Sequence, residues 1–208
     1  NNILGKNFFK KKINFSLNSS LEAQIAAISD DIAYNSHDLE DGLKSNLFKL
    51  NDLKSIPVLN KIITKHIKKL KKYSIDLIIR QIIRDIINEM VRDVIFTTKK
   101  NIKLNKIKNL NDVYKTKKQL VSFSDKMKKF DSQIKRFLKQ KMYFHKKVNS
   151  KTNYGRKVIT QLFARIKRNP KKYINIKKYN NLNTERIICD YIAGMTDRYA
   201  INLYNQIK

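Results

Sequence analysis

Residues that make tight turns are scarce in this sequence of 208 residues, which contains four glycines and two prolines. Folds built only from β-strands need more turn residues than that, so an all-α fold is favoured. The single cysteine, Cys189, excludes internal disulfides and a zinc cluster, and it fits a reducing, cytoplasmic compartment. On a helix we expect Cys189 to be a small buried apolar residue.

Several signatures of function and targeting are also missing. The sequence has no glycine-rich phosphate loop, no His-Glu-x-x-His pair and no Ser-His-Asp set. No signal peptide is visible, and because the first residue is Asn rather than Met, we expect the chain to begin inside a longer protein. The longest apolar repeat, over 75–95, is broken by charged residues on its other face, so we expect no membrane span.

Apolar residues at helical spacing predict a series of helices. The repeat over 75–95, after an N-cap at Ser74, predicts a core helix. Residues 97–122 are predicted to form a loop and a short helix. Gly194 lies in the middle of the last predicted helix, which indicates close approach of another helix. The other helices are predicted over 19–43, over 55–70, from Ser124 towards Val148, over 153–169 and from 183 to the end.

Residues 19–43 are the only stretch in which the sequence stops being basic. The chain has 46 Lys and Arg, yet none of them falls between Lys12 and Lys44, whereas six acidic residues do. A capping box of Ser19 and Glu22, an isoleucine repeat and a stop at Gly42 predict an amphipathic helix here.

On this helix Asp30, Tyr34 and Asp38 follow each other at intervals of four residues, roughly opposite the isoleucines. Charged residues on a helix normally face solvent, so a solvated face is one interpretation. The stripe continues through Ala23 and Ala27, however, where this chain elsewhere places lysine on open faces. Acidic, aromatic and small residues together are consistent with the wall of a cavity, which is the second interpretation.

Two blocks of the sequence carry a resemblance to a known family. Residues 22–43, EAQIAAISDDIAYNSHDLEDGL, closely resemble the last metal-ligand helix of the bacterial dGTPase-like deoxynucleoside triphosphate (dNTP) triphosphohydrolases, members of the HD-domain superfamily. Residues 189–200, CDYIAGMTDRYA, resemble that family's C-terminal signature. The resemblance implies the C-terminal part of an HD-domain-type helical bundle. It assigns 1–54 to the end of the HD core and 55–208 to a C-terminal helical region that packs on it.

The resemblance also implies a role for each residue of the stripe. Asp30 corresponds to the last of four metal ligands, and the metal, Mg²⁺ or Mn²⁺, polarises phosphate and generates a nucleophile from water. Asp38 corresponds to the acceptor for the 3′-hydroxyl of deoxyribose, and Tyr34 to the residue that packs at the sugar. Two helical turns, about 11 Å, separate Asp30 from Asp38. That length is enough to span from an α-phosphate to the sugar.

A later segment resembles a family helix whose basic and aromatic residues contact the phosphates and the sugar. Lys135, Tyr143 and His145 align with it, and a tyrosine at the sugar 2′ edge would favour deoxyribose. The alternative is that Lys135 and His145 are surface residues and Tyr143 is a core residue. Asp190, Asp197 and Arg198 lie in the terminal signature, where helix pairing or subunit contact is the expected role.

The sequence departs from the family in its histidines. Of His37, His66 and His145, only His37 precedes an Asp, and it lies on the later helix rather than upstream of it. The chain therefore supplies one of the four metal ligands, and we expect it to be inactive alone. The family's reaction cuts a dNTP at the α-phosphate, giving deoxynucleoside and tripolyphosphate, and the resemblance further implies a homo-oligomer.

The net charge of +29 also invites a nucleic-acid interpretation. Lys, Asn, Ile and Tyr are abundant together, as a strongly AT-rich coding sequence would produce whatever the function, so charge alone decides little. The alternative function is a non-catalytic basic helical module that binds single-stranded DNA. Its support is lysine on the outer faces of 58–72, 124–148 and 153–169, with Tyr and Phe interleaved.

Overall fold

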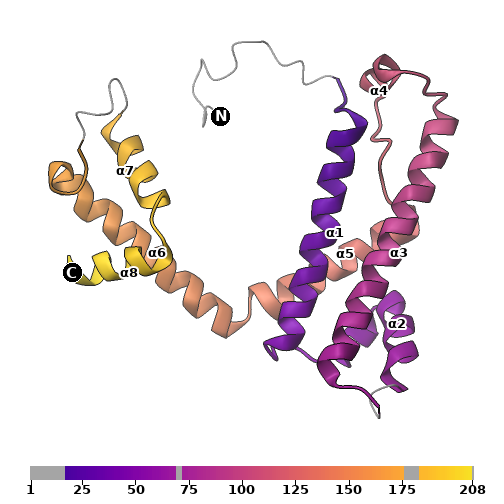
Figure 1. Ribbon diagram of the computed structural model, residues 1–208, viewed down its shortest axis with the longest axis horizontal. Coiled ribbons are helices and arrows are strands. Elements are labelled where there is room, and N and C mark those ends of the chain that lie inside the picture. Colours follow the sequence, from indigo (N-terminus) through magenta and orange to yellow (C-terminus); the bar gives the residue numbers. More distant parts are fainter. Residues whose placement is uncertain (1–16, 69–71, 176–182, 208) are drawn as a thin grey trace. The chain divides into compact units, whose positions relative to one another are not determined.

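The computed structural model describes residues 17–68, 72–175 and 183–207. These residues form helices and helical turns, with no strand among them, which confirms the prediction of an all-α fold. In the same ranges no helix is both long enough and apolar enough to cross a bilayer. In chain order the elements are α1 (Leu21–Lys44), η1 (Asp52–Ser55), α2 (Pro57–Ile67), α3 (Ile75–Leu104), α4 (Leu110–Lys115), α5 (Asp125–Leu138), the π-helical turn η3 (Lys139–Tyr143), α6 (Lys146–Arg168), η4 (Pro170–Lys172), α7 (Thr184–Ala193) and α8 (Asp197–Gln206) (Figure 1).

The chain divides into two compact units, Asn1–Met142 and Tyr143–Lys208. The first unit holds α1 to α5, and the second holds α6 to α8. The division predicted after residue 54 does not coincide with this boundary, because α1 packs on α3 and α5 of the same unit. The assignment of 1–54 to the end of a larger HD core stays a prediction.

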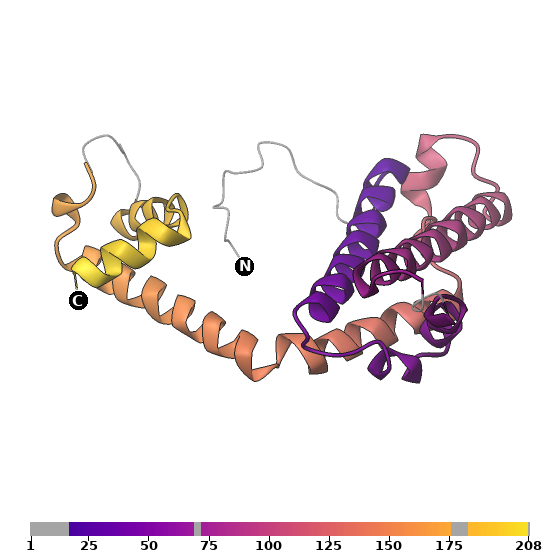
Figure 2. The same cartoon turned by 60° about the horizontal axis from the view of Figure 1, so that its bottom comes forward.

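The first unit is built around α3, which contacts both α1 and α2 (Figures 1 and 2). Ser74 caps its N-terminus as predicted, and the Ser74 Oγ accepts a hydrogen bond from the Leu77 N–H at 3.4 Å. Apolar residues of α1, α2 and α5 join those of α3 in one core. The buried residues of α3 are Ile78, Ile79, Ile82, Ile83, Ile86, Met90 and Val94.

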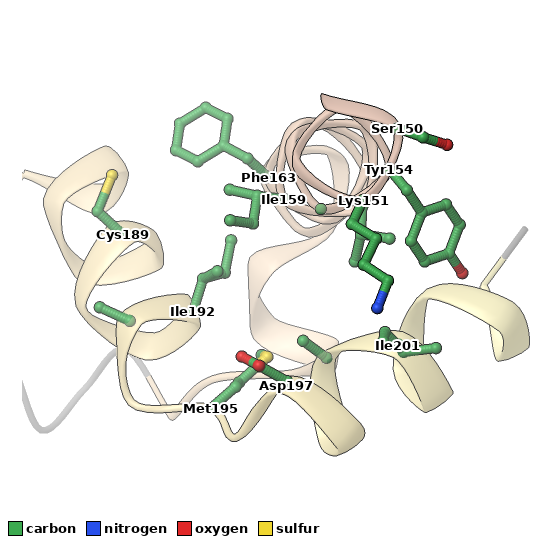
Figure 3. A pocket seen from close by; sticks show the side chains of 14 residues that line it. Ser150, Lys151, Tyr154, Ile159, Phe163, Cys189, Ile192, Met195, Asp197 and Ile201 are labelled. Atoms are coloured by element: carbon green, nitrogen blue, oxygen red, sulfur yellow. The ribbon is translucent and has the colours of Figure 1, made fainter. Parts of the chain in front are cut away.

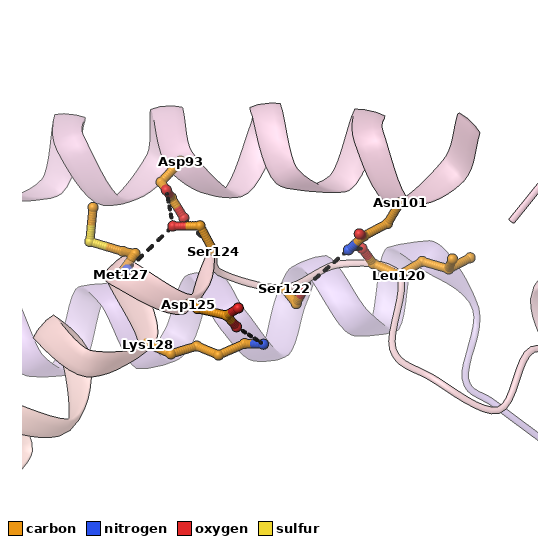
Figure 4. Close-up of polar contacts among 8 residues, drawn as sticks. All are labelled: Asp93, Asn101, Leu120, Ser122, Ser124, Asp125, Met127 and Lys128. Atoms are coloured by element: carbon orange, nitrogen blue, oxygen red, sulfur yellow. Dashed lines mark hydrogen bonds and ion pairs between the residues drawn. The ribbon is translucent and has the colours of Figure 1, made fainter. Parts of the chain in front are cut away.

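The predicted end of α3 at residue 95 is wrong, because the helix continues to Leu104. Its last turns carry few apolar residues, and a polar contact holds them instead. The Asn101 amide donates hydrogen bonds to the Leu120 carbonyl at 2.9 Å and to the Ser122 hydroxyl at 3.1 Å (Figure 4). The chain leaves the helix at Lys106, whose φ is +52°.

Ser124 caps α5 as predicted, and α3 fixes the position of this cap. The Asp93 carboxylate accepts hydrogen bonds from the Ser124 N–H at 2.8 Å and from the Ser124 hydroxyl at 2.6 Å (Figure 4). The helical stretch that follows this cap continues from α5 through η3 to Tyr143 and stops short of Val148, and α6 begins at Lys146 rather than at the predicted 153. The seven residues between α5 and α6, KQKMYFH, contain no glycine or proline that could have located the break.

Two details at the ends of α1 differ from the prediction. Ser20 is the N-cap rather than Ser19, and its hydroxyl accepts a hydrogen bond from the Ala23 N–H at 3.3 Å. Gly42 does not stop the helix, which continues to Lys44. Gly42 is buried against Phe48, so that a Cβ at this position would lie 2.2 Å from the ring. The glycine therefore permits a close approach inside the core.

Replacing Gly42 by Ala is expected to destabilise the first unit by about 1–3 kcal/mol. The added Cβ requires the Phe48 ring to move, although this ring is buried and packs edge to face on Phe137, with centroids 4.9 Å apart. The better helix propensity of Ala, worth about 1 kcal/mol, offsets part of the loss. Urea unfolding followed by circular dichroism measures the difference. In a Phe48→Leu background the same substitution should cost much less, and an equal cost in both backgrounds would contradict the steric explanation.

A buried histidine joins α2 to α3. His66 Nε2 lies 2.8 Å from Asp85 Oδ2, and Lys65 Nζ lies 2.9 Å from the same oxygen. An ionised carboxylate can only accept, so Nε2 carries the proton. His66 Nδ1 is buried and has no hydrogen-bond partner among the described residues. The hydrogen bond from His66 lowers the pKa of Asp85, burial raises it by less, and Lys65 lowers it further.

The lowered pKa of Asp85 predicts an acid-dependent stability. Because the folded state favours the carboxylate, this contribution is fully present above the unfolded pKa of about 3.9 and is lost as pH falls through the lower folded value. The wild-type chain should therefore exceed Asp85→Asn in free energy of unfolding at pH 6, and the gap should close below about pH 4. Urea unfolding across this pH range tests it. A gap independent of pH would show that the ionised carboxylate is not what stabilises the contact.

The second unit has its own core, formed by α6, α7 and α8 with Ile174. The single helix predicted from 183 is wrong, because Gly194 ends α7 and α8 begins at Asp197. Among the described residues, a Cβ on Gly194 would meet within 4 Å only two carbonyl oxygens of α7, at 3.5 and 3.7 Å, so the predicted close approach of another helix is wrong there. Cys189 is exposed rather than buried, since Ile187 and Ile188 occupy the inner side of α7.

Candidate functional site

Asp30, Tyr34 and Asp38 lie along one side of α1. Asp30 and Tyr34 are exposed, with Tyr34 exposed to 61%, whereas Asp38 is half-buried. Four residues advance about 40° beyond a full turn, so the stripe winds gradually towards the packed side of the helix. Asp30, at the phosphate end of the predicted site, is therefore open to solvent, and Asp38, at the sugar end, is partly enclosed.

The buried side of α1 is more polar than the isoleucine repeat predicted. Ile32 is buried as expected, but Ile25 is 49% exposed, since it lies at the edge of that side. Three polar residues share the buried side, and two of them bind other segments through their side chains. The buried residues of α1 are Gln24, Ile32, Asn35, Ser36, Leu39, Gly42 and Leu43.

A metal at Asp30 requires ligands from elsewhere. The exposed carboxylate is a suitable oxygen ligand for Mg²⁺ or Mn²⁺. Within the described ranges, however, no group of three His, Cys, Asp or Glu residues is arranged to hold a metal ion. Asp30 fits as one ligand and does not by itself make a site.

Lys135, a predicted residue from a later helix, lies against α1. Its Nζ lies 3.1 Å from Asp31 Oδ2 and 3.0 Å from Asp131 Oδ2. Asp31 directly follows Asp30, so Lys135 lies next to the predicted site. Sequence analysis missed the pairing with Asp31, because Asp31 and Lys135 are 104 positions apart. Its role at a phosphate stays a prediction.

Tyr143 and His145 belong to the second unit. Tyr143 closes η3 and is 36% exposed, so it is not a core residue of this unit. His145 is the N-cap of α6, where its Nδ1 accepts a hydrogen bond from the Lys147 N–H at 3.3 Å. The predicted contacts of both residues with a nucleotide stay predictions.

The terminal signature, residues 189–200, covers the second half of α7, its capping glycine and the first turn of α8. Asp190 forms a two-point contact with Arg186 on the same helix, at 2.9 and 3.0 Å. A hydrogen bond between Tyr191 of α7 and Tyr199 of α8 raises the pKa of Tyr191 to about 12. The Tyr191–Tyr199 hydrogen bond joins α7 to α8. The roles expected for Asp190, Asp197 and Arg198 stay predictions.

A groove of about 1130 Å³ opens between α6, α7 and α8 in the second unit (Figure 3). Ile159, Phe163 and Ile192 line its apolar part, and the Lys151 and Tyr154 side chains lie together towards α8. Sequence analysis did not predict this groove, because its lining residues come from three helices and share no spacing.

Comparison with known proteins gives a consistent set of relatives. Residues 121–206 match the phosphohydrolase-associated domain, HD_assoc. The chain is 50% identical over 203 residues to a deoxyguanosinetriphosphate triphosphohydrolase-like protein of Pelagibacter ubique, covering 98% of this chain and 54% of the relative. A protein of the same description from Rickettsia typhi is 34% identical over 206 residues, which cover 96% of this chain and 54% of the relative. Another, from Geobacter sulfurreducens, is 35% identical over 200 residues, which cover 90% of this chain and 49% of the relative. The chain thus spans about half the length of the curated relatives it matches.

Proposed function

We propose that this chain, which is similar over nearly its whole length to deoxyguanosinetriphosphate triphosphohydrolase-like proteins, forms one wall of the nucleotide site in a metal-dependent dNTP triphosphohydrolase. It corresponds to a C-terminal part of these proteins. The proposed reaction cuts a dNTP, with dGTP as the first candidate, at the α-phosphate and gives deoxynucleoside and tripolyphosphate. The observation that carries the proposal is the stripe of Asp30, Tyr34 and Asp38 on α1.

The chemistry of the stripe suits a deoxynucleotide. The exposed ring of Tyr34 offers a flat surface on which a deoxyribose can pack. Asp38, one turn further and partly enclosed, can accept a hydrogen bond from the 3′-hydroxyl. Asp30, one turn on the other side, is open to a phosphate-bound metal. Asp30 thus lies at the phosphate end of the proposed nucleotide site, and Tyr34 and Asp38 lie at its sugar end.

The metal proposed is Mg²⁺ or Mn²⁺, with Asp30 as one of its ligands. When bound, such an ion polarises a phosphate oxygen and lowers the pKa of a coordinated water. In this proposal Asp30 supplies one hard oxygen donor, and the other ligands come from residues outside these 208. We therefore propose that the 208-residue chain is inactive alone.

The test uses the complete reading frame that encodes this chain. The purified protein is incubated with dGTP and Mg²⁺ or Mn²⁺, and the products are separated by anion exchange and identified by ³¹P NMR. Tripolyphosphate and deoxyguanosine in equal amounts are expected. Release of pyrophosphate or orthophosphate instead would overturn the reaction class, and activity of the 208-residue chain by itself would overturn its proposed dependence on other ligands.

Two further properties are proposed from the family resemblance. The complete protein is proposed to act in the cytoplasm, with no membrane partner, and to form a homo-oligomer. Mass photometry of the complete protein at nanomolar concentration would show a single mass several times that of one chain. A monomer at all concentrations would remove the oligomer from the proposal.

A second candidate function, binding of single-stranded DNA, has one observation in its favour. The helix α6 carries eight Lys and Arg residues and no acidic residue, and all eight are exposed. Phe144 and Tyr154 are exposed beside them, at 62% and 46%. Cationic side chains that neutralise phosphates and aromatic rings that stack on bases are the elements of such a surface.

The two functions can be separated by measuring binding without nucleotide hydrolysis. The 208-residue chain is titrated into a fluorescent single-stranded oligonucleotide at several salt concentrations. A steep fall in affinity with salt supports the DNA surface. No retention of the oligonucleotide at low salt dismisses it.

A further inference from the structure

Four polar side chains join α1 to α5 and form what we term the α1–α5 network: Asp31, Asn35, Asp131 and Lys135. The Asn35 amide donates a hydrogen bond to Asp131 Oδ1 at 2.9 Å. Lys135 Nζ lies 3.0 Å from Asp131 Oδ2 and 3.1 Å from Asp31 Oδ2. Each helix contributes two residues one turn apart, so the network holds two points of each helix.

Two members of the network are largely buried, whereas the Asp31 and Lys135 side chains are 57% and 45% exposed. Asn35 is 4% exposed, and the Asp131 side chain is 13% exposed. A buried amide and a mostly buried carboxylate lose far more by standing unpaired than exposed groups do. Burial lowers the pKa of Lys135, but the hydrogen bonds that its ammonium group donates to Asp131 and Asp31 outweigh this effect and raise the pKa. The ammonium group therefore stays charged between two carboxylates.

The network determines which side of α1 is open. Asp31 and Asn35 each directly follow a residue of the stripe, Asp30 and Tyr34, and one residue corresponds to a rotation of 100° about the helix axis. A rotation of α1 that turned Asp30 towards α5 would break both ends of the network. The paired carboxylates thus fix the direction in which the neighbouring carboxylate points.

We propose that Lys135 is a positioning residue, which acts on the nucleotide site by fixing the rotation of α1 rather than by touching the phosphates. This inference rests on the proposed function and changes the role that the family resemblance implies for Lys135. A phosphate that bound Lys135 directly would have to replace two carboxylates already in contact with its ammonium group, at a place where those carboxylates repel it. The same lysine held between Asp31 and Asp131 needs no rearrangement.

The kinetic test uses the complete protein with dGTP and compares Lys135→Met, Asp131→Asn and the double variant. A displaced metal ligand lowers kcat, so each single change is expected to reduce kcat about tenfold with KM within about twofold. The double variant should lose about as much as either single one, because both remove the same contact. Lys135→Arg should recover most of the loss. Lys128→Met, which removes a lysine of α5 that pairs with Asp125 of the same helix, is the matched control.

Direct phosphate binding predicts a different pattern. In that case Lys135→Met raises KM with little change in kcat, whereas Asp131→Asn frees the lysine and leaves or improves affinity. That pattern would overturn the positioning role. Circular dichroism of each variant confirms that it folds before kinetics are compared.

A second readout does not depend on activity. In the 208-residue chain, 3-fluorotyrosine is placed at position 34, and its ¹⁹F resonance is recorded for the same variants. Lys135→Met and Asp131→Asn should both shift the resonance, and Lys128→Met should not. An unchanged resonance would overturn the network's control of α1. If the complete protein does not hydrolyse dGTP at all, the proposed function fails, and the fluorine experiment still decides the positioning role.

Discussion

Replacing Asp30 by Asn in the complete protein is expected to lower hydrolysis of dGTP by at least about a thousandfold. Asn has the same shape but no charge, so it is a far poorer ligand for Mg²⁺ or Mn²⁺. The fold should not change, because Asp30 is exposed on α1. The measurement is the initial rate of tripolyphosphate release at saturating dGTP and metal.

Glu89→Gln provides the matched control for Asp30→Asn. Glu89 is also an exposed carboxylate in the middle of a long helix, α3, but it is not part of the stripe. Its substitution should change the rate less than about twofold, as surface substitutions remote from a site do. If Asp30→Asn keeps more than a tenth of the wild-type rate while binding the metal normally, the carboxylate is not a ligand.

Replacing Gln24 by Met is expected to lower the free energy of unfolding of the first unit by about 2–4 kcal/mol. Gln24 is 3% exposed, and its Oε1 accepts hydrogen bonds from the Leu120 N–H at 2.9 Å and the Val121 N–H at 3.1 Å. Its Nε2 donates to the Ser19 carbonyl at 2.8 Å. Methionine fills similar space but can make none of these bonds, so two buried N–H groups lose their acceptor.

Urea unfolding of the 208-residue chain, followed by circular dichroism, measures this loss. Gln133→Met on α5 is the control, because Gln133 belongs to the same unit and is exposed. It should change the stability by less than about 0.5 kcal/mol. A loss below about 1 kcal/mol for Gln24→Met would mean that the two N–H groups find another acceptor.

The helices with a strong apolar period were predictable from the sequence, and their ends were less so. Ser74 and Ser124 each precede such a period, and both are N-caps in the structure. At α1 two serines compete, and Ser20 becomes the cap while the Ser19 carbonyl accepts from Gln24. Gly42 could be read as a stop because the Phe48 ring that explains it lies outside the helix. Tertiary contacts therefore decided what local signals left open.

The candidate site shows the same division. The helical period placed Asp30, Tyr34 and Asp38 on one side of α1 without any coordinates. The pairing of Asp31 with Lys135 could not be inferred, because no rule of spacing connects two positions on different helices. Even so, Asp31 and Asn35 of α1 are four residues apart in the sequence, and so are Asp131 and Lys135 of α5. That spacing was a signal for two facing polar patches.

Two residues of α3, Asp93 and Asn101, together fix the length and position of the segment that enters α5. Eight helical residues advance about 12 Å, and four extended residues span about 13 Å, which matches the step from Leu120 to Ser124. Both ends of the segment from Leu120 to Ser124 are thus held on α3 by hydrogen bonds. The connection through 105–109 can consequently gain or lose residues while the register of α5 is preserved.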